Sequence, residues 1–182
     1  MHVRGVAYLA REGLMKDEFG AEKWAAFVNG LKPRLAFLNA PILPVTRIPV
    51  ADFLALNDDI IRVFYKGDDS EYWRFGEHSG EWALGHQLKG LFAPGEARKF
   101  LQFTPKIWSS YFDGGDLSTV LEPASVDIRI TGVPVRHIYF EASVIGFAIG
   151  GLKALGLTPA PQRLKGYTLG DNEVLYRFAA TT

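Results

Sequence analysis

His137 and Glu141 are the residues of this chain whose types and spacing most directly suggest chemistry. They stand four positions apart at the start of an otherwise apolar segment, residues 135–155. In a helix this spacing puts two side chains on one face, and a buried carboxylate needs a partner such as an imidazole. The sequence therefore predicts a His137–Glu141 pair. The pair either lies at the rim of a ligand pocket, where it fixes a ligand or responds to pH, or is a structural pair at a helix N-terminus.

Other histidines and acids do not predict a metal centre. His78 and His86 lie eight residues apart on one expected helix, roughly 80° apart around its axis, so they cannot chelate one ion together. Asp113 and Asp116 flank two glycines but offer far fewer ligands than a calcium loop requires. We expect these acids to cap and turn the chain, and we predict no metal site.

Patterns of known catalytic sites are also missing. No serine stands in a Gly-x-Ser-x-Gly frame, and His137 and Glu141 have no evident third group to orient them for acid–base catalysis. The chain has no cysteine, which excludes a cysteine nucleophile, disulfides and thiolate-bound zinc. We assign no catalytic residue and favour a non-enzymatic role.

Composition and charge exclude further classes. The chain has 182 residues, 48% of them hydrophobic and 22% charged, which is typical of one soluble globular domain. Twenty Lys and Arg balance twenty Asp and Glu, so there is no basic surplus to attract nucleic acid. No apolar run reaches the roughly 18 residues of a membrane span, and we expect a cytoplasmic protein.

The first part of the chain has helical periodicity. Trp24, Phe27, Val28 and Leu31 form one apolar stripe, and proline or acidic residues near positions 49, 68 and 94 predict the starts of three further helices. The pair Thr104–Pro105 predicts an N-cap and first helical residue, hence a separate short helix over 106–112.

The second part changes to a period of two. Residues 117–122 and 126–131 predict a hairpin, residues 135–155 an apolar helix, and residues 162–169 and 174–179 a second hairpin. Gly146, Gly150 and Gly151 are interpreted as close-packing positions on that helix. We predict one α+β domain over 1–182, with a helical half over about 1–112. A sheet-containing half over about 116–180 carries an antiparallel sheet backed by the apolar helix.

One stretch of the chain also carries a family resemblance. It comprises Pro105, Trp108, Tyr111 and Phe112 before Gly114 and Gly115, then the hairpin that ends in Gly132 and Pro134. With the apolar helix and terminal hairpin, it resembles an uncharacterised bacterial domain family expanded as paralogues in myxobacteria. That family is similar in fold to 4-vinyl-reductase-like domains, and more distantly to haem-nitric-oxide-binding domains and a vesicle-tethering subunit family. The resemblance implies a pocket between the helices and the sheet.

The residues that supply chemistry in those relatives do not carry over. The phenol-sensing relatives bind zinc, and the tethering relatives attach a lipid, through cysteines that this chain lacks. The haem-binding relatives use an axial histidine with a Tyr-x-Ser-x-Arg element, which is absent here. The resemblance therefore favours neither thiolate-bound zinc nor haem, and it leaves the cofactor unknown.

Two functional hypotheses follow. The first is a non-catalytic small-molecule-binding or sensory module for a hydrophobic or aromatic ligand; the second is a ligand-free interaction module, such as a homodimer. Polar groups inside the pocket would favour the first, whereas the aromatic residues alone are also consistent with ordinary core. The candidate pocket residues are Trp108, Tyr111, Phe112, His137, Phe140, Glu141, Val144 and Tyr167.

Overall fold

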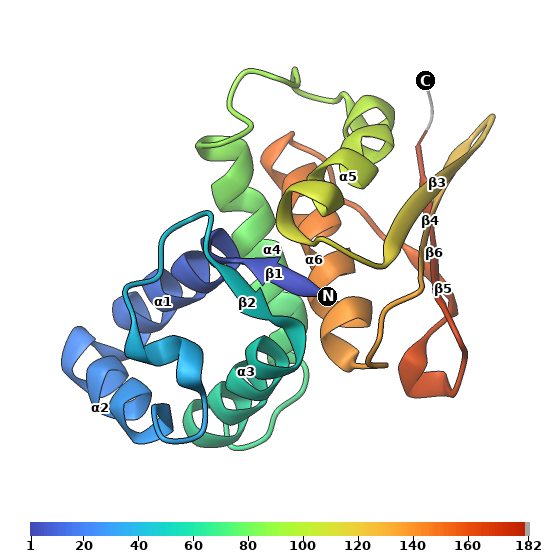
Figure 1. Ribbon diagram of the computed structural model, residues 1–182. Helices are drawn as coiled ribbons and strands as arrows, with labels where there is room; N and C mark the ends of the chain where they lie inside the picture. The colour runs from blue at the N-terminus through green and yellow to red at the C-terminus, as the bar shows by residue number, and fades with distance from the viewer. Residues whose placement is uncertain (181–182) are drawn as a thin grey trace.

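The computed structural model describes residues 1–180, and five of its helices lie in the first part of the chain (Figure 1). The N-terminal helices are α1 (Gly5–Phe19), α2 (Ala21–Leu31), α3 (Val50–Phe64), α4 (Glu71–Gly85) and α5 (Ala97–Tyr111), with a short 3-10 turn, η1 (Ala36–Asn39). The hairpin β3 (Asp116–Glu122) and β4 (Ser125–Thr131), the helix α6 (Ile138–Ala154), the strand β5 (Gln162–Lys165), the turn η2 (Tyr167–Leu169) and the strand β6 (Val174–Ala179) follow. The predicted α+β class and element order are confirmed.

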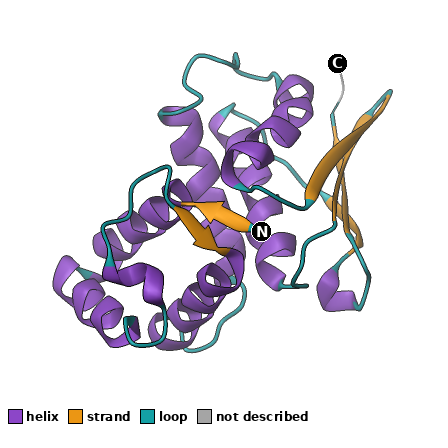
Figure 2. Cartoon of the chain, viewed as in Figure 1, coloured by secondary structure: helices purple, strands orange, loops and turns teal. Residues whose placement is uncertain are grey.

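The second half of the chain builds one antiparallel sheet in the order β3-β4-β6-β5. Ile128 of β4 pairs with Tyr176 of β6, and Val126 pairs with Phe178. These four side chains are at most 3% exposed, as the alternating pattern predicts for a sheet with one buried face. Helices α5 and α6 lie between this sheet and the remaining helices (Figures 1 and 2).

A second, two-stranded sheet was not predicted. Strand β1 (His2–Arg4) pairs antiparallel with β2 (Arg47–Pro49), so that Val3 faces Ile48, and both side chains are fully buried. Val3 also forms an isolated bridge with Phe112, just after α5. Three residues are too few to show a period of two, so these strands had no sequence signal.

Glycines allow α4 and α6 to cross at close range. A Cβ atom on Gly146 would lie 2.6 Å from the carbonyl oxygen of Trp73, and one on Gly150 would overlap the carbonyl group of Glu77. Gly76 and Gly80 of α4 leave the same kind of space for the backbone of α6. The interpretation of the α6 glycines as close-packing positions is confirmed.

The predicted break before Pro105 is wrong, because α5 runs without interruption from Ala97 to Tyr111. Proline has no N–H, so the carbonyl of Leu101 loses its usual helical partner at position 105. The hydroxyl of Thr104 donates to that carbonyl at 2.7 Å and replaces the missing bond. Thr104 is therefore a mid-helix residue and not an N-cap.

No helix within residues 1–180 combines the length and the apolar character needed to cross a membrane.

Candidate functional site

A small cavity of about 70 Å³ lies where the helical part of the chain meets the sheet. It is lined by Ala7, Ala10 and Arg11 of α1; Phe75, Gly76 and Ser79 of α4; Thr104, Ile107, Trp108 and Tyr111 of α5 with Phe112; Leu117 of β3 and Ile128 of β4; and Tyr139, Ser143, Val144, Phe147 and Ala148 of α6. Its rim is half-buried, at Ala7, Ala10, Tyr111 and Val144 among others. The cavity is thus lined by six elements, four helices and two strands, and opens toward solvent between the helices.

The structure brings together four of the eight candidate residues. Trp108, Tyr111, Phe112 and Val144 line the cavity. Phe140 lies behind this wall, with its ring centroid 6.0 Å from that of Trp108 and 5.8 Å from that of Phe112. The other three candidates, His137, Glu141 and Tyr167, are not part of the lining.

The predicted pairing of His137 with Glu141 is wrong, because His137 is the N-cap of α6 and not a residue within it. Its backbone is extended (φ −142°, ψ 142°), so helical spacing does not apply to its side chain. Nδ1 accepts the N–H of Tyr139 at 3.0 Å, which leaves the proton on Nε2 to be donated to Asp58 at 3.0 Å. His137 therefore closes the first turn of α6 and ties it to α3.

Glu141 is paired with a different part of the chain. Its side chain is 2% exposed and accepts hydrogen bonds from the backbone N–H of Thr168 at 2.9 Å and the hydroxyl of Thr168 at 2.8 Å. Nη1 of Arg163 completes the set at 2.6 Å. Gly166 makes room for this carboxylate, since a Cβ there would lie 2.6 Å from Cδ of Glu141. The group fastens α6 to β5 and η2, away from the cavity.

Replacing His137 with alanine is expected to lower the free energy of unfolding by about 1 kcal/mol, because the substitution removes an N-cap acceptor. His137→Asn, which retains a capping side chain, is expected to recover most of that loss. Urea unfolding followed by circular dichroism measures both. Equal stability of His137→Ala and the wild type would contradict the capping role.

Six of the eighteen residues that line the cavity are aromatic. The rings of Trp108 and Phe112 are tilted by 34° with centroids 4.4 Å apart, and the ring of Tyr111 meets that of Phe147 edge-on at 6.0 Å. Burial raises the pKa of the Tyr111 hydroxyl to about 12, and burial does the same for the pKa of Tyr139. Both phenols are therefore neutral near pH 7, and the aromatic part of the wall carries no charge.

The most unexpected lining residue is Arg11, which no sequence pattern pointed to. It lies on α1 and is only 5% exposed. Its Nε donates to Oδ1 of Asn57 at 3.0 Å, and its Cζ lies 3.5 Å from the centroid of the Phe75 ring. An arginine side chain on a helix is usually solvated, so only the packing of α1 against α3 and α4 reveals that Arg11 is buried.

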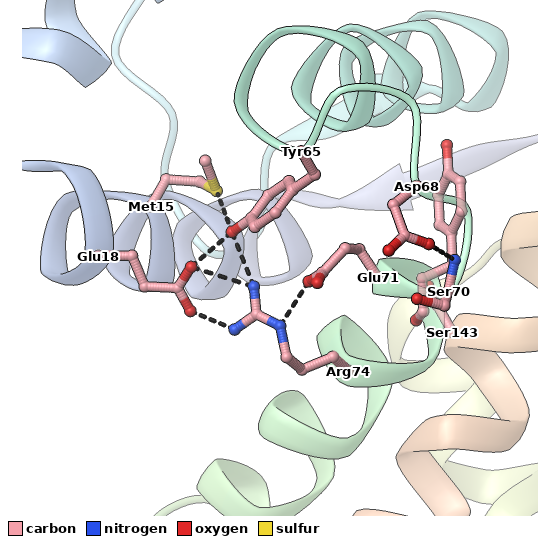
Figure 3. Close-up of polar contacts among 9 residues, drawn as sticks. Met15, Glu18, Tyr65, Asp68, Ser70, Glu71, Arg74 and Ser143 are labelled. Atoms are coloured by element: carbon pink, nitrogen blue, oxygen red, sulfur yellow. Dashed lines mark hydrogen bonds and ion pairs between the residues drawn. The ribbon is translucent and has the colours of Figure 1, made fainter.

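A polar network beside the cavity holds these helices in place (Figure 3). Arg74 of α4 contacts the carboxylate of Glu18 on α1 and that of Glu71 in its own first turn. Nη2 of Arg74 also donates to the hydroxyl of Tyr65 at 2.8 Å, and Tyr65 donates to Glu18 at 2.6 Å. The network joins α1, the end of α3 and α4, which together fix Arg11 and Phe75.

No protein-family model matches the sequence, and no curated protein matches it either. Solved structures do match. An H-NOX protein from S. oneidensis in the Fe(II)NO ligation state aligns over 98% of this chain and 99% of its own, with a TM-score of 0.78 and 10% identity. The chain has the H-NOX fold.

Two further H-NOX structures agree. An NMR structure of an H-NOX domain from Shewanella oneidensis in the Fe(II)CO ligation state covers 98% of this chain and 99% of its own, at a TM-score of 0.77 and 9% identity. A mutant H-NOX protein from K. algicida in the Fe(II) unliganded state aligns over 98% of this chain and 97% of its own, with a TM-score of 0.68 and 13% identity. The predicted distant link to haem-nitric-oxide-binding domains is confirmed at the level of the H-NOX fold. The closer resemblance to 4-vinyl-reductase-like domains stays a prediction.

The lining of this cavity does not fit a haem. Proteins hold haem iron through His, Cys, Met or Tyr side chains. Among the lining residues that the structure describes, only Tyr111 and Tyr139 belong to that set, and their raised pKa values disfavour the phenolate that binds iron. The cavity, about 70 Å³, is also far smaller than a haem.

The histidines lie elsewhere in the H-NOX fold. His78, on α4, lines a separate surface groove against α1 whose edge includes the exposed Gly13 and Asp17. Burial lowers the pKa of His78, which keeps its imidazole neutral. Across residues 1–180, no three His, Asp or Glu side chains converge as a metal site.

Proposed function

We propose that this chain is a non-catalytic small-molecule-binding or sensory module, and that its ligand enters the cavity between the helices and the sheet. The observation that carries the proposal is the cavity itself, which combines an aromatic wall with a buried cation, Arg11. Pockets of this character, mostly apolar with a few convergent polar groups, are the usual form of ligand sites. The H-NOX fold supports this proposal by analogy only, because one fold hosts many functions.

We further propose that the ligand is not haem. The donor set of the lining and the size of the cavity both support this, as does the missing Tyr-x-Ser-x-Arg element. A hydrophobic or aromatic small molecule is better matched to rings such as Phe75, Trp108 and Phe147.

Native mass spectrometry of the protein purified from its own host tests the proposal. The expected result is a retained small molecule on the wild-type chain. The variant Val144→Trp, which fills the cavity from α6, should lose that mass, whereas Val63→Trp, at a 52% exposed position on α3, should keep it. Circular dichroism confirms that both variants are folded.

The proposal fails if no bound mass is found and if thermal scans with aromatic, lipid and tetrapyrrole compounds never raise the melting temperature. The same spectrum decides the second candidate, a ligand-free interaction module. Val120 and Leu121 favour that candidate, because they are 51% and 44% exposed on β3, an edge strand of the described sheet. A dimer mass without a ligand would support it.

A further inference from the structure

Arg11 is a buried cation without a counter-charge. It is 5% exposed, and no Asp or Glu within residues 1–180 lies at ion-pair distance from it. Burial lowers its pKa only to about 10, so the guanidinium is charged at neutral pH. The neighbouring Tyr139 hydroxyl is neutral under the same conditions, because burial raises its pKa to about 12. A buried charge in this state is costly unless something pairs with it.

Other arginines of the chain show what Arg11 lacks. Arg74 is much more exposed, yet it contacts two carboxylates, those of Glu18 and Glu71 (Figure 3). Arg163 pairs with the buried Glu141 at 2.6 Å. Within residues 1–180, Arg11 contacts the amide oxygen of Asn57 and the face of Phe75, neither of which carries a charge.

A second polar group of the same cavity lacks a hydrogen-bond acceptor. Nε1 of Trp108 is fully buried and has no hydrogen-bond acceptor among the described residues. Buried N–H groups of this kind are rarely left unpaired. Arg11 and Trp108 both line the cavity, and the hydroxyls of Ser79 and Ser143 in the same lining donate to backbone carbonyls. The cavity therefore has an excess of donors and of positive charge inside an apolar wall.

We propose that the ligand is a monocarboxylic acid with an apolar body. This inference rests on the function proposed above. The carboxylate of the ligand pairs with the planar guanidinium of Arg11, a geometry that arginine forms well. The volume of about 70 Å³ has room for a carboxylate group. The apolar body extends toward the half-buried rim, between Ala10 of α1 and Tyr111 of α5.

A comparison of phenylacetate with phenylacetamide tests this inference on the wild-type protein. The two probes have nearly the same shape, but only the first is an anion. We expect millimolar phenylacetate to raise the melting temperature and to give a binding isotherm by titration calorimetry, and we expect phenylacetamide to do neither. Butyrate and butyramide form a second pair with a smaller body.

Variants then assign the site. Arg11→Gln is expected to weaken phenylacetate binding at least about tenfold, because a charge pair in a desolvated site is lost. Arg98→Gln serves as the control: Arg98 is a half-buried arginine of α5 outside the cavity lining, it donates to the backbone carbonyl of Glu122, and this variant should bind like the wild type. Trp108→Phe, which removes the unpaired N–H, should bind more weakly than the wild type.

Each outcome has a fixed meaning. Equal binding of acid and amide, abolished for both by Val144→Trp, would overturn the carboxylate inference while the proposed ligand-binding function stands. Undiminished binding of phenylacetate to Arg11→Gln, or no binding of either acid to the wild type, would also overturn the inference. If native mass spectrometry and thermal scans additionally find no ligand of any class, the proposed function falls with it. An Arg11→Gln variant that does not fold leaves the acid–amide comparison to decide.

Discussion

Replacing Gly150 with alanine is expected to lower the free energy of unfolding by about 3 kcal/mol, the upper end of the range of roughly 1–3 kcal/mol that is typical of overpacking. The new Cβ atom would overlap the backbone of Glu77 on α4, and a helix backbone cannot rotate away as a flexible side chain can. The two helices would have to separate, and the packing on both sides of their crossing would be lost. Urea unfolding followed by tryptophan fluorescence measures the change.

Gly13 provides a matched control for this substitution. It also lies inside a helix, α1, but nothing lies within 4 Å of a Cβ built there. Gly13→Ala is therefore expected to raise the free energy of unfolding by roughly 0.5–1 kcal/mol, since alanine restricts the unfolded chain and favours the helix. The same chemical change thus has opposite signs at the two sites. Equal effects would contradict the close crossing of α4 and α6.

Replacing Glu141 with glutamine is expected to cost about 2–3 kcal/mol, a range typical of hydrogen bonds to buried charged groups. Three donors, two from Thr168 and one from Arg163, converge on the two carboxylate oxygens. Glutamine offers one acceptor oxygen, and its NH₂ group would face a donor. The loss should appear as a lower urea midpoint with an unchanged slope.

Glu77 is the control for this second substitution. It pairs with Lys153 at 2.6 Å, and it bridges α4 and α6, but both side chains are substantially exposed. Surface ion pairs of this kind contribute little, so Glu77→Gln should change stability by no more than about 0.5 kcal/mol. A Glu141→Gln variant as stable as Glu77→Gln would show that the Glu141 group does not hold α6 to the C-terminal strands.

Regular elements were predictable because their signals are local. The alternation of Val126, Ile128 and Ile130 reflects the two faces of a strand, and every residue that produces the signal lies within that strand. The same holds for the stripe around Trp24 in α2, and for the glycines of α6, which had no role other than close approach. The helix α5 was misjudged because Thr104–Pro105 is a true start signal whose effect was reversed by one side-chain hydrogen bond.

The candidate site was predictable only in part. Trp108 and Tyr111 lie three residues apart at the end of α5, so their shared position on the cavity wall followed from helical spacing, and Phe112 is the C-cap that follows them. His137 and Glu141 were paired on the assumption that both are helical, but the helix begins one residue after His137. Their true partners, Asp58 and Arg163, are distant in sequence, and no periodicity points to them.

The sequence by itself determined the α+β class, the order in which the helices and the strands of the four-stranded sheet follow one another, the absence of thiol chemistry and the aromatic character of the α5 end. These properties depend on composition and on neighbours within one element. Only the tertiary structure decided that Arg11 is buried in the cavity without a carboxylate, that Glu141 belongs to the C-terminal strands, and that the lining does not fit a haem. Burial and pairing are set by which elements meet in space, and that information is shared among residues far apart in the chain.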